Sequence, residues 1–259
     1  PGDLNGDLFD DLVVGAPEGE LTGQGAVHVF LGGSAGLSAP SQTIQPIDGI
    51  TGDRFGSDVA NAGDVNGDGF PDVVIGAPGG TDASGAATGA AYLAYGGNAA
   101  GLATSTMVKL LPPGGHAGDL FGSAVGFIGD INDDGYDDVA VGAPYAAPLG
   151  LVEQGLAYIF LGSPTGIQTT ATVVSPATPT AYLFFGWSIA YAGDVNDDGV
   201  DDAAFGSGGI AIAGQVEFLY GSALGLSPHP DEILLPSDPF GKNEFSRQVA
   251  LLGDTDGDL

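Results

Sequence analysis

The sequence predicts an all-β protein: a β-propeller of four-stranded antiparallel blades, with four blade-equivalents in 259 residues. Three observations predict this fold. A nine-residue acidic loop recurs at intervals of 61, 66, 64 and 60 residues, a short apolar run follows each complete copy, and no segment keeps a 3.6-residue apolar period. A fixed period of this size is typical of repeat architectures, and four short strands per repeat fit a propeller blade. A solenoid is the rival, but its units are usually shorter.

The acidic loops mark the repeat most clearly. Three copies are complete: DVNGDGFPD from Asp64, DINDDGYDD from Asp130 and DVNDDGVDD from Asp194. A variant, DLNGDLFDD, begins at Asp3, and a shorter copy, DTDGDL, begins at Asp254. These five loops hold 20 of the 33 acidic residues, so the formal net charge of −29 is concentrated in them.

We expect four strands in each unit, named A to D in chain order, with the acidic loop joining A to B. Strand A starts at Phe-Gly and has small side chains, which suit a strand crowded near a central axis. Strand B is the apolar run after the loop, and three of the four B runs end in Gly-Ala-Pro, where proline stops the ladder. The expected strands are 55–63, 121–129, 185–193 and 245–253 for A; 12–14, 73–75, 139–141 and 203–205 for B; 25–31, 89–95, 155–161 and 214–220 for C; and 42–47, 107–111, 172–174 and 232–235 for D.

The first unit lacks strand A, so the expected order is BCD, ABCD, ABCD, ABCD, A. The whole chain is then a single propeller domain or a fragment of one. Its blade units are expected at about 1–48, 55–111, 121–175 and 185–235. The last A strand could complete the first blade and close a ring of four, or the chain could be an open part of a larger propeller. Because the chain starts and ends inside acidic loops, we expect a piece excised or processed from something longer.

The order Phe-Gly, D-x-N-x-D-G-x-x-D, Gly-Ala-Pro resembles the FG-GAP repeat of integrin α-subunit propellers and related bacterial surface proteins. The resemblance covers nearly the whole chain, and it implies that the acidic loop joins the first two strands of a blade and binds calcium. The chain departs from the pattern at Leu8 and Leu259, where the other loops have Gly. It also has Phe245-Ser246 for Phe-Gly, and 206–208 is Gly-Ser-Gly in place of the fourth Gly-Ala-Pro.

The chemistry of the loop also favours calcium, a hard cation that takes six to eight oxygen ligands. Positions 1, 3, 5 and 9 supply side-chain oxygens, position 7 would supply a carbonyl, and Gly at position 6 permits a sharp turn. The carboxylate that an EF-hand needs at position 12 is missing, because Val14, Ile75, Val141 and Phe205 stand there. The alternative is an acidic turn without metal, whose crowded carboxylates would repel one another.

We therefore predict three or four structural Ca2+ sites, with a weaker one in the first loop because of Leu8. The predicted ligands are Asp3, Asn5, Asp7, Phe9 and Asp11; Asp64, Asn66, Asp68, Phe70 and Asp72; Asp130, Asn132, Asp134, Tyr136 and Asp138; Asp194, Asn196, Asp198, Val200 and Asp202; and Asp254, Asp256 and Asp258.

Composition argues against several classes of function. Four basic residues are too few for a phosphate-binding surface, so we predict no nucleic-acid partner, and an anionic membrane is disfavoured. No apolar run reaches about 18 residues, so we predict no direct membrane insertion. There is no Ser–His–Asp order, P-loop or zinc spacing, so we predict no enzyme. His28 and Trp187 are more simply explained as face and core residues of strands.

Hairpin alternation places the A–B and C–D loops on one face of the disc and the B–C and D–A loops on the other. The second set, at 17–25, 79–89, 144–155 and 112–121, varies among repeats, as binding loops on a rigid scaffold do. In integrins the corresponding face binds ligand and partner subunit, so the resemblance implies a protein or glycan ligand there. We predict a calcium-stabilised adhesion or ligand-binding module, extracellular or on the cell surface. The alternatives are a catalytic or non-catalytic propeller domain of a secreted polysaccharide-degrading enzyme, or a structural spacer.

Overall fold

The computed structural model describes the chain except residues 1, 20–22, 47, 210–212, 238–244 and 251–259. The described residues form fifteen strands in four antiparallel sheets and one 3-10 turn, Pro148–Gly150. This confirms the predicted all-β propeller with almost no helix. None of the described residues lies in a helix with the length and hydropathy to cross a membrane.

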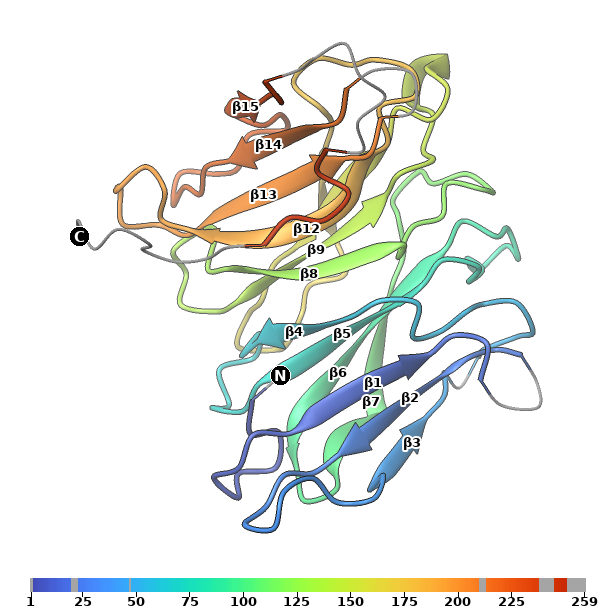
Figure 1. Ribbon diagram of the computed structural model, residues 1–259, viewed down its shortest axis with the longest axis vertical. Helices are drawn as coiled ribbons and strands as arrows, with labels where there is room; N and C mark the ends of the chain where they lie inside the picture. Colours follow the sequence, from blue (N-terminus) through green and yellow to red (C-terminus); the bar gives the residue numbers. More distant parts are fainter. Residues whose placement is uncertain (1, 20–22, 47, 210–212, 238–244, 251–259) are drawn as a thin grey trace.

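The sheets follow the predicted order BCD, ABCD, ABCD, ABCD, and we number them as blades 1 to 4. In Figure 1 they succeed one another from the blue sheet at the bottom to the orange and red sheet at the top. The strands are β1 (Leu12–Ala16), β2 (Ala26–Phe30) and β3 (Gln42–Ile44) in blade 1; β4 (Val59–Gly63), β5 (Asp72–Ala77), β6 (Ala90–Asn98) and β7 (Gly101–Leu110) in blade 2; β8 (Ala124–Gly129), β9 (Asp138–Ala143), β10 (Leu156–Phe160) and β11 (Ala171–Val174) in blade 3; and β12 (Phe185–Gly193), β13 (Asp202–Ser207), β14 (Gln215–Leu219) and β15 (Glu232–Leu234) in blade 4.

The A strands β4, β8 and β12 are the innermost strands of their blades. Together with Val249 and Ala250 they line one cavity of about 330 Å3. Their small residues at this surface include Ala60, Gly126 and Ala190, which leave room for the strands to converge. The lining also includes the larger side chains of Phe127, Ile189 and Tyr191, so small residues make up only part of this surface.

Each blade is joined to the next by the Phe-Gly turn at the start of strand A. Phe55, Phe121 and Phe185 are fully buried, and each forms a parallel bridge to the glycine that precedes strand C of the blade before. Gly142, the glycine of Gly-Ala-Pro, lies so close to the next blade that a Cβ there would overlap the Gly186 carbonyl oxygen. The two halves of the repeat motif therefore meet across the interface between neighbouring blades.

The hydrophobic core is divided among these interfaces. One cluster packs blade 1 on blade 2 around Phe55 and Ile75, and another packs blade 2 on blade 3 around Phe121 and Tyr158. A third packs blade 3 on blade 4 around Phe185. Both faces of blades 2 and 3 are thus covered, which explains why strands β5 and β9 are buried at every residue. Strand β13 of blade 4 is also buried throughout, and its Ala204 packs in a smaller cluster with Val216 and Val249.

Strand β1 differs from the other B strands because no A strand pairs with its inner edge in the described part of the chain. Leu12 and Val14 are each 41% exposed, whereas Val73 and Ile75 at the same positions of β5 are fully buried. Gly2 forms an isolated bridge to Asp11 at the position where the last residue of an A strand, Gly63, pairs with Asp72 in blade 2. Gly2 therefore stands where an A strand of blade 1 would end.

The last segment was expected to form an A strand over 245–253, but its described part, 245–250, is turns and irregular chain. Residues 251–253 lie outside the described residues. A Cβ at Gly214 would overlap the Phe245 carbonyl oxygen, and the Ser246 hydroxyl bonds Ser207 N and O at 3.1 and 3.0 Å. Phe245–Ser246 therefore docks on blade 4 as a Phe-Gly turn would, but residues 247–250 pair with no B strand.

Within the described residues, no strand pairing joins blade 1 to blade 4, so hydrogen bonds do not close the four sheets into a ring. Whether 245–253 completes blade 1 stays a prediction.

The interface between blades should not tolerate a methyl group at the Gly-Ala-Pro glycine. We expect Gly142→Ala to lower the free energy of unfolding by about 1–3 kcal/mol, because Cβ and the Gly186 carbonyl cannot share the space. Gly33→Ala is the control, since its Cβ would find its nearest atom at 3.8 Å. Urea unfolding of both variants measures the difference, and equal stabilities would contradict this account of the motif.

Candidate functional site

The acidic loops join strand A to strand B, and we number them loops 1 to 4: Asp3–Asp11, Asp64–Asp72, Asp130–Asp138 and Asp194–Asp202. In blades 2, 3 and 4 each loop connects the last residue of β4, β8 or β12 to the first of β5, β9 or β13. The predicted ligands Asp254, Asp256 and Asp258 lie outside the described residues.

Positions 1, 3 and 5 come together in all four loops through one hydrogen-bond pattern. In loop 3 the Asp130 carboxylate accepts from the N–H groups of Asp134 and Gly135, at 2.9 and 2.7 Å. The Asn132 amide donates to Asp134 Oδ2 at 3.1 Å, and Asp134 Oδ1 accepts from Tyr136 N at 3.1 Å. Loops 1, 2 and 4 repeat these contacts.

Position 6 has the left-handed backbone that the sequence predicted. The φ angles of Gly69, Gly135 and Gly199 are 87–89°. Leu8 takes the same role in loop 1 with φ 74°, which costs a side chain roughly 1–2 kcal/mol, and this side chain is 91% exposed. Loop 1 nevertheless keeps the common hydrogen bonds, so Leu8 strains the loop without changing its shape.

Position 9 plays a part that the ligand pattern does not reveal. Asp72, Asp138 and Asp202 are fully buried, and both oxygens of each carboxylate accept backbone N–H groups. For Asp138 the donors are Ile131 at 3.1 Å and Gly162, in the C–D turn of the same blade, at 2.8 Å. This aspartate therefore ties the acidic loop to the C–D turn, and Asp11 makes the same pair of bonds in loop 1.

Burial also changes the acidity of these groups. It raises the pKa of Asp72 and of Asp138 to about 7, against the effect of the backbone N–H groups that favour the anion. The aspartates at positions 1 and 5 of each loop raise these pKa values further by charge repulsion. A cation held in the loop would relieve that repulsion.

The donor set suits a hard cation, because positions 1, 3, 5 and 9 offer only carboxylate and amide oxygens. In the described part of the chain, however, no three Asp, Glu or His side chains converge as they would around an ion. The structure thus brings positions 1, 3 and 5 together and engages position 9 with backbone N–H groups. The ligand assignment, including the carbonyls of position 7, stays a prediction.

Two loop positions were missed by the sequence reasoning. Position 4 also has positive φ, from 57 to 77°, in Gly6, Gly67, Asp133 and Asp197. The signal was present, because Gly and Asp are residues that tolerate this conformation. Position 8 is the other: Asp137 and Asp201 reach across to the preceding loop, and nothing within one repeat could have indicated this.

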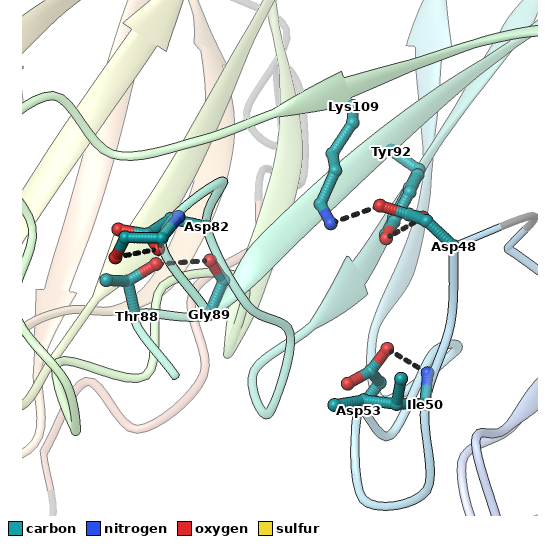
Figure 2. A network of polar contacts seen from close by, with 9 residues as sticks. Asp48, Ile50, Asp53, Asp82, Thr88, Gly89, Tyr92 and Lys109 are labelled. Carbon is teal, nitrogen blue, oxygen red and sulfur yellow. Dashed lines mark hydrogen bonds and ion pairs between the residues drawn. The ribbon is translucent and has the colours of Figure 1, made fainter. Parts of the chain in front are cut away.

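The face made by the B–C and D–A loops is held by its own polar contacts. Figure 2 shows Lys109 and Tyr92 of blade 2 directed at Asp48 in the link from blade 1, with distances of 2.5 and 2.9 Å. Ile50 N donates to the Asp53 carboxylate at 2.8 Å and closes the same link into a turn.

On blades 3 and 4 of the same face, aromatic residues gather. Trp187 packs edge-on against Phe184 and beside Tyr145, and the Arg247 guanidinium lies 5.2 Å from the Trp187 ring centre. His28 Nδ1 lies 3.0 Å from the Thr43 hydroxyl, and His229 Nδ1 lies 2.9 Å from the hydroxyl and 3.4 Å from the carbonyl oxygen of Ser175.

Comparison with known proteins agrees with the repeat. The model of the FG-GAP repeat matches residues 1–30, 55–93 and 121–160. Integrin alpha-6 of Gallus gallus is 41% identical over 153 residues, which is 59% of this chain and 13% of that protein. Integrin alpha-IIb of Mus musculus is 34% identical and integrin alpha-V of Gallus gallus 31% identical, each over 223 residues, 82% of this chain and 20% of those proteins. The chain thus spans at most a fifth of the length of these relatives.

The two kinds of loop aspartate should behave differently without metal. In excess chelator, we expect Asp138→Ala to lower the free energy of unfolding by at least about 2 kcal/mol, because two buried N–H groups lose their acceptor. Asp134→Ala removes an exposed carboxylate of the same loop and should cost well under half as much. Urea unfolding in chelator compares them; equal losses would show that position 9 has no special structural part.

Proposed function

This chain contains FG-GAP repeats and is related to integrin α subunits, and from that premise we propose that it is a calcium-stabilised extracellular β-propeller that binds a ligand rather than catalysing a reaction. The observation that carries the proposal is the fourfold acidic loop, with the same oxygen-rich conformation in every described copy. The oxygen-rich loops support cation binding. The variable loops on the opposite face of a rigid disc support ligand recognition.

Calcium would be held by the side chains of positions 1, 3 and 5, completed by the carbonyl of position 7 and the carboxylate of position 9. When bound, it supplies positive charge that offsets the carboxylates packed into nine residues. The chain contributes the rest: the N–H groups of positions 5 to 7 fix the carboxylates, and position 9 fastens the loop to the C–D turn. The bound ion would raise the free energy of unfolding, because an ion that binds only the folded state stabilises it.

Calcium titration tests the proposal directly. We expect chelator-stripped protein to bind three or four Ca2+ ions by calorimetry, with a rise in melting temperature of several degrees, because each site adds about 2.7 kcal/mol at a hundredfold excess over its dissociation constant. Asp134→Ala should remove one ion. Asp133→Gly removes the same charge at position 4, where loop 2 has Gly67, and should leave the number of ions unchanged. No binding, or equal loss in both variants, would refute calcium as the ligand of these loops.

We place the partner, a protein or glycan, on the face opposite the acidic loops. This face carries exposed apolar side chains next to ordered backbone: Val152 is 48% and Tyr182 44% exposed, and Tyr182 N donates to Val152 O at 2.9 Å. Ile50, 53% exposed, lies in the turn closed by Asp53. Exposed apolar side chains on loops that are already held in place favour binding, because little conformational entropy is lost on association.

Substitution on the two faces separates them. We expect the double variant Val152→Ser, Tyr182→Ser to lose at least about tenfold in affinity for any extracellular protein or glycan that the wild type captures from an array, since buried aromatic contacts dominate binding energy. Leu224→Ser is the control, because Leu224 is 99% exposed in the C–D turn of the acidic-loop face. The opposite pattern of losses would move the binding site to the acidic loops, and capture of nothing would favour a structural spacer.

A further inference from the structure

The acidic loops of neighbouring blades are joined by a carboxylate at position 8. Asp137 of loop 3 accepts the backbone N–H of Asp64, the first residue of loop 2, at 2.6 Å. Asp201 of loop 4 accepts the N–H of Asp130, the first residue of loop 3, at 3.0 Å. The same contact therefore occurs twice, and each time it ends on the backbone of a predicted calcium ligand.

Room for this carboxylate is built into the preceding strand. A Cβ on Gly63 or Gly129, the last residue of β4 and β8, would overlap the Oδ2 atom of Asp137 or Asp201. Both glycines also have positive φ, 69 and 77°. The glycine before loop 2 and the glycine before loop 3 thus each serve the next blade as well as their own turn.

Further contacts join loops 2, 3 and 4 into one continuous row. Ser163 N, in the C–D turn of blade 3, donates to Val65 O of loop 2 at 3.0 Å, and Ser222 N donates to Ile131 O at 2.9 Å. The Tyr136 ring lies over Gly67 of loop 2, where a Cβ would meet it at 2.7 Å.

Loops 1 and 2 lack the carboxylate link, because position 8 of loop 2 is Pro71. They keep the other contacts: Gly97 N donates to Leu4 O at 2.8 Å, and the Phe70 ring lies over Gly6. At position 8 of loop 1, the Asp10 side chain is exposed. The chain therefore allows an internal comparison: the loop pairs 2–3 and 3–4 have a carboxylate link, and the pair 1–2 has a proline at the linking position.

We infer that Asp137 and Asp201 are positioning residues that couple cation occupancy of neighbouring loops, so that loops 2, 3 and 4 fill cooperatively and loop 1 fills independently. The inference rests on the proposed calcium binding. Asp137 stands between the position-7 and position-9 ligands of its own loop, so a cation in loop 3 holds it in place against Asp64 N. A cation at Asp64 attracts the Asp137 anion in return, and such coupling is reciprocal.

A mutant cycle measured by calorimetry with CaCl2 on the chelator-stripped full chain tests this. Asp68→Ala disables loop 2, and we expect it to weaken binding at loop 3 by about fivefold or more, the lower range of typical coupling. With Asp137→Asn present, which keeps an acceptor oxygen but removes the charge, disabling loop 2 should weaken loop 3 less than twofold. Asp7→Ala, which disables loop 1, should leave the remaining sites unchanged.

Asp10→Asn is the matched control, because it removes the same charge at the same loop position, where the side chain is exposed and has no link to another of the described loops. It should leave the ratio of the stepwise binding constants unchanged, and melting in chelator verifies that every variant folds. Calcium binding without coupling, or equal effects of Asp137→Asn and Asp10→Asn, would overturn this inference and leave the proposed calcium function standing. No calcium binding by the wild type would overturn both.

Discussion

The close approach of backbone between successive blades is the constraint on which the rest of the structure depends. The glycine of each B strand faces the carbonyl of the Phe-Gly glycine in the next blade: Gly15 faces Gly56, Gly76 faces Gly122, and Gly142 faces Gly186. A Cβ at the first residue of any pair would overlap that carbonyl oxygen. At these three interfaces the blades can pack this closely only if both positions are free of side chains, while the neighbouring Phe fills the core. The spacing of the blades follows from this contact, and with it the row in which the acidic loops stand.

Within a blade, the position-9 aspartate makes the loop part of the fold. Asp72 accepts from Val65 N at 3.1 Å and from Gly96 N at 2.9 Å, and Asp138 and Asp202 repeat this arrangement. Burying a carboxylate is costly unless its oxygens are hydrogen-bonded, and here two backbone N–H groups meet that need. The residue that would complete a cation site is thus also the residue that fixes the A–B loop to the C–D turn. Stability and metal binding are consequently linked through one side chain.

The sequence was sufficient to predict the strand order and the conformation of the loops, because both depend on local patterns that recur. The period located each blade, and Gly at position 6 predicted the left-handed turn that Gly135 adopts. It was insufficient for contacts between repeats. Strand β7 begins at Gly101, six residues before the predicted 107, because register shifts near Tyr95 let the hairpin extend through its turn. The links made by Asp137 and Asp201 span 73 and 71 residues, and no periodic pattern shows which backbone group lies opposite.

Loop 1 shows which residues determine the conformation of a loop and which determine its link to the next loop. It has no A strand before it in the described part of the chain and has Leu8 where a glycine is expected, yet Asp3 and Asp7 make the same hydrogen bonds as in the other loops. The loop conformation is therefore encoded by its own nine residues and does not depend on a complete blade. What loop 1 lacks is the carboxylate link to its neighbour, because Pro71 stands at the linking position. Local chemistry can thus recur unchanged along the chain while position 8 decides which loops act together.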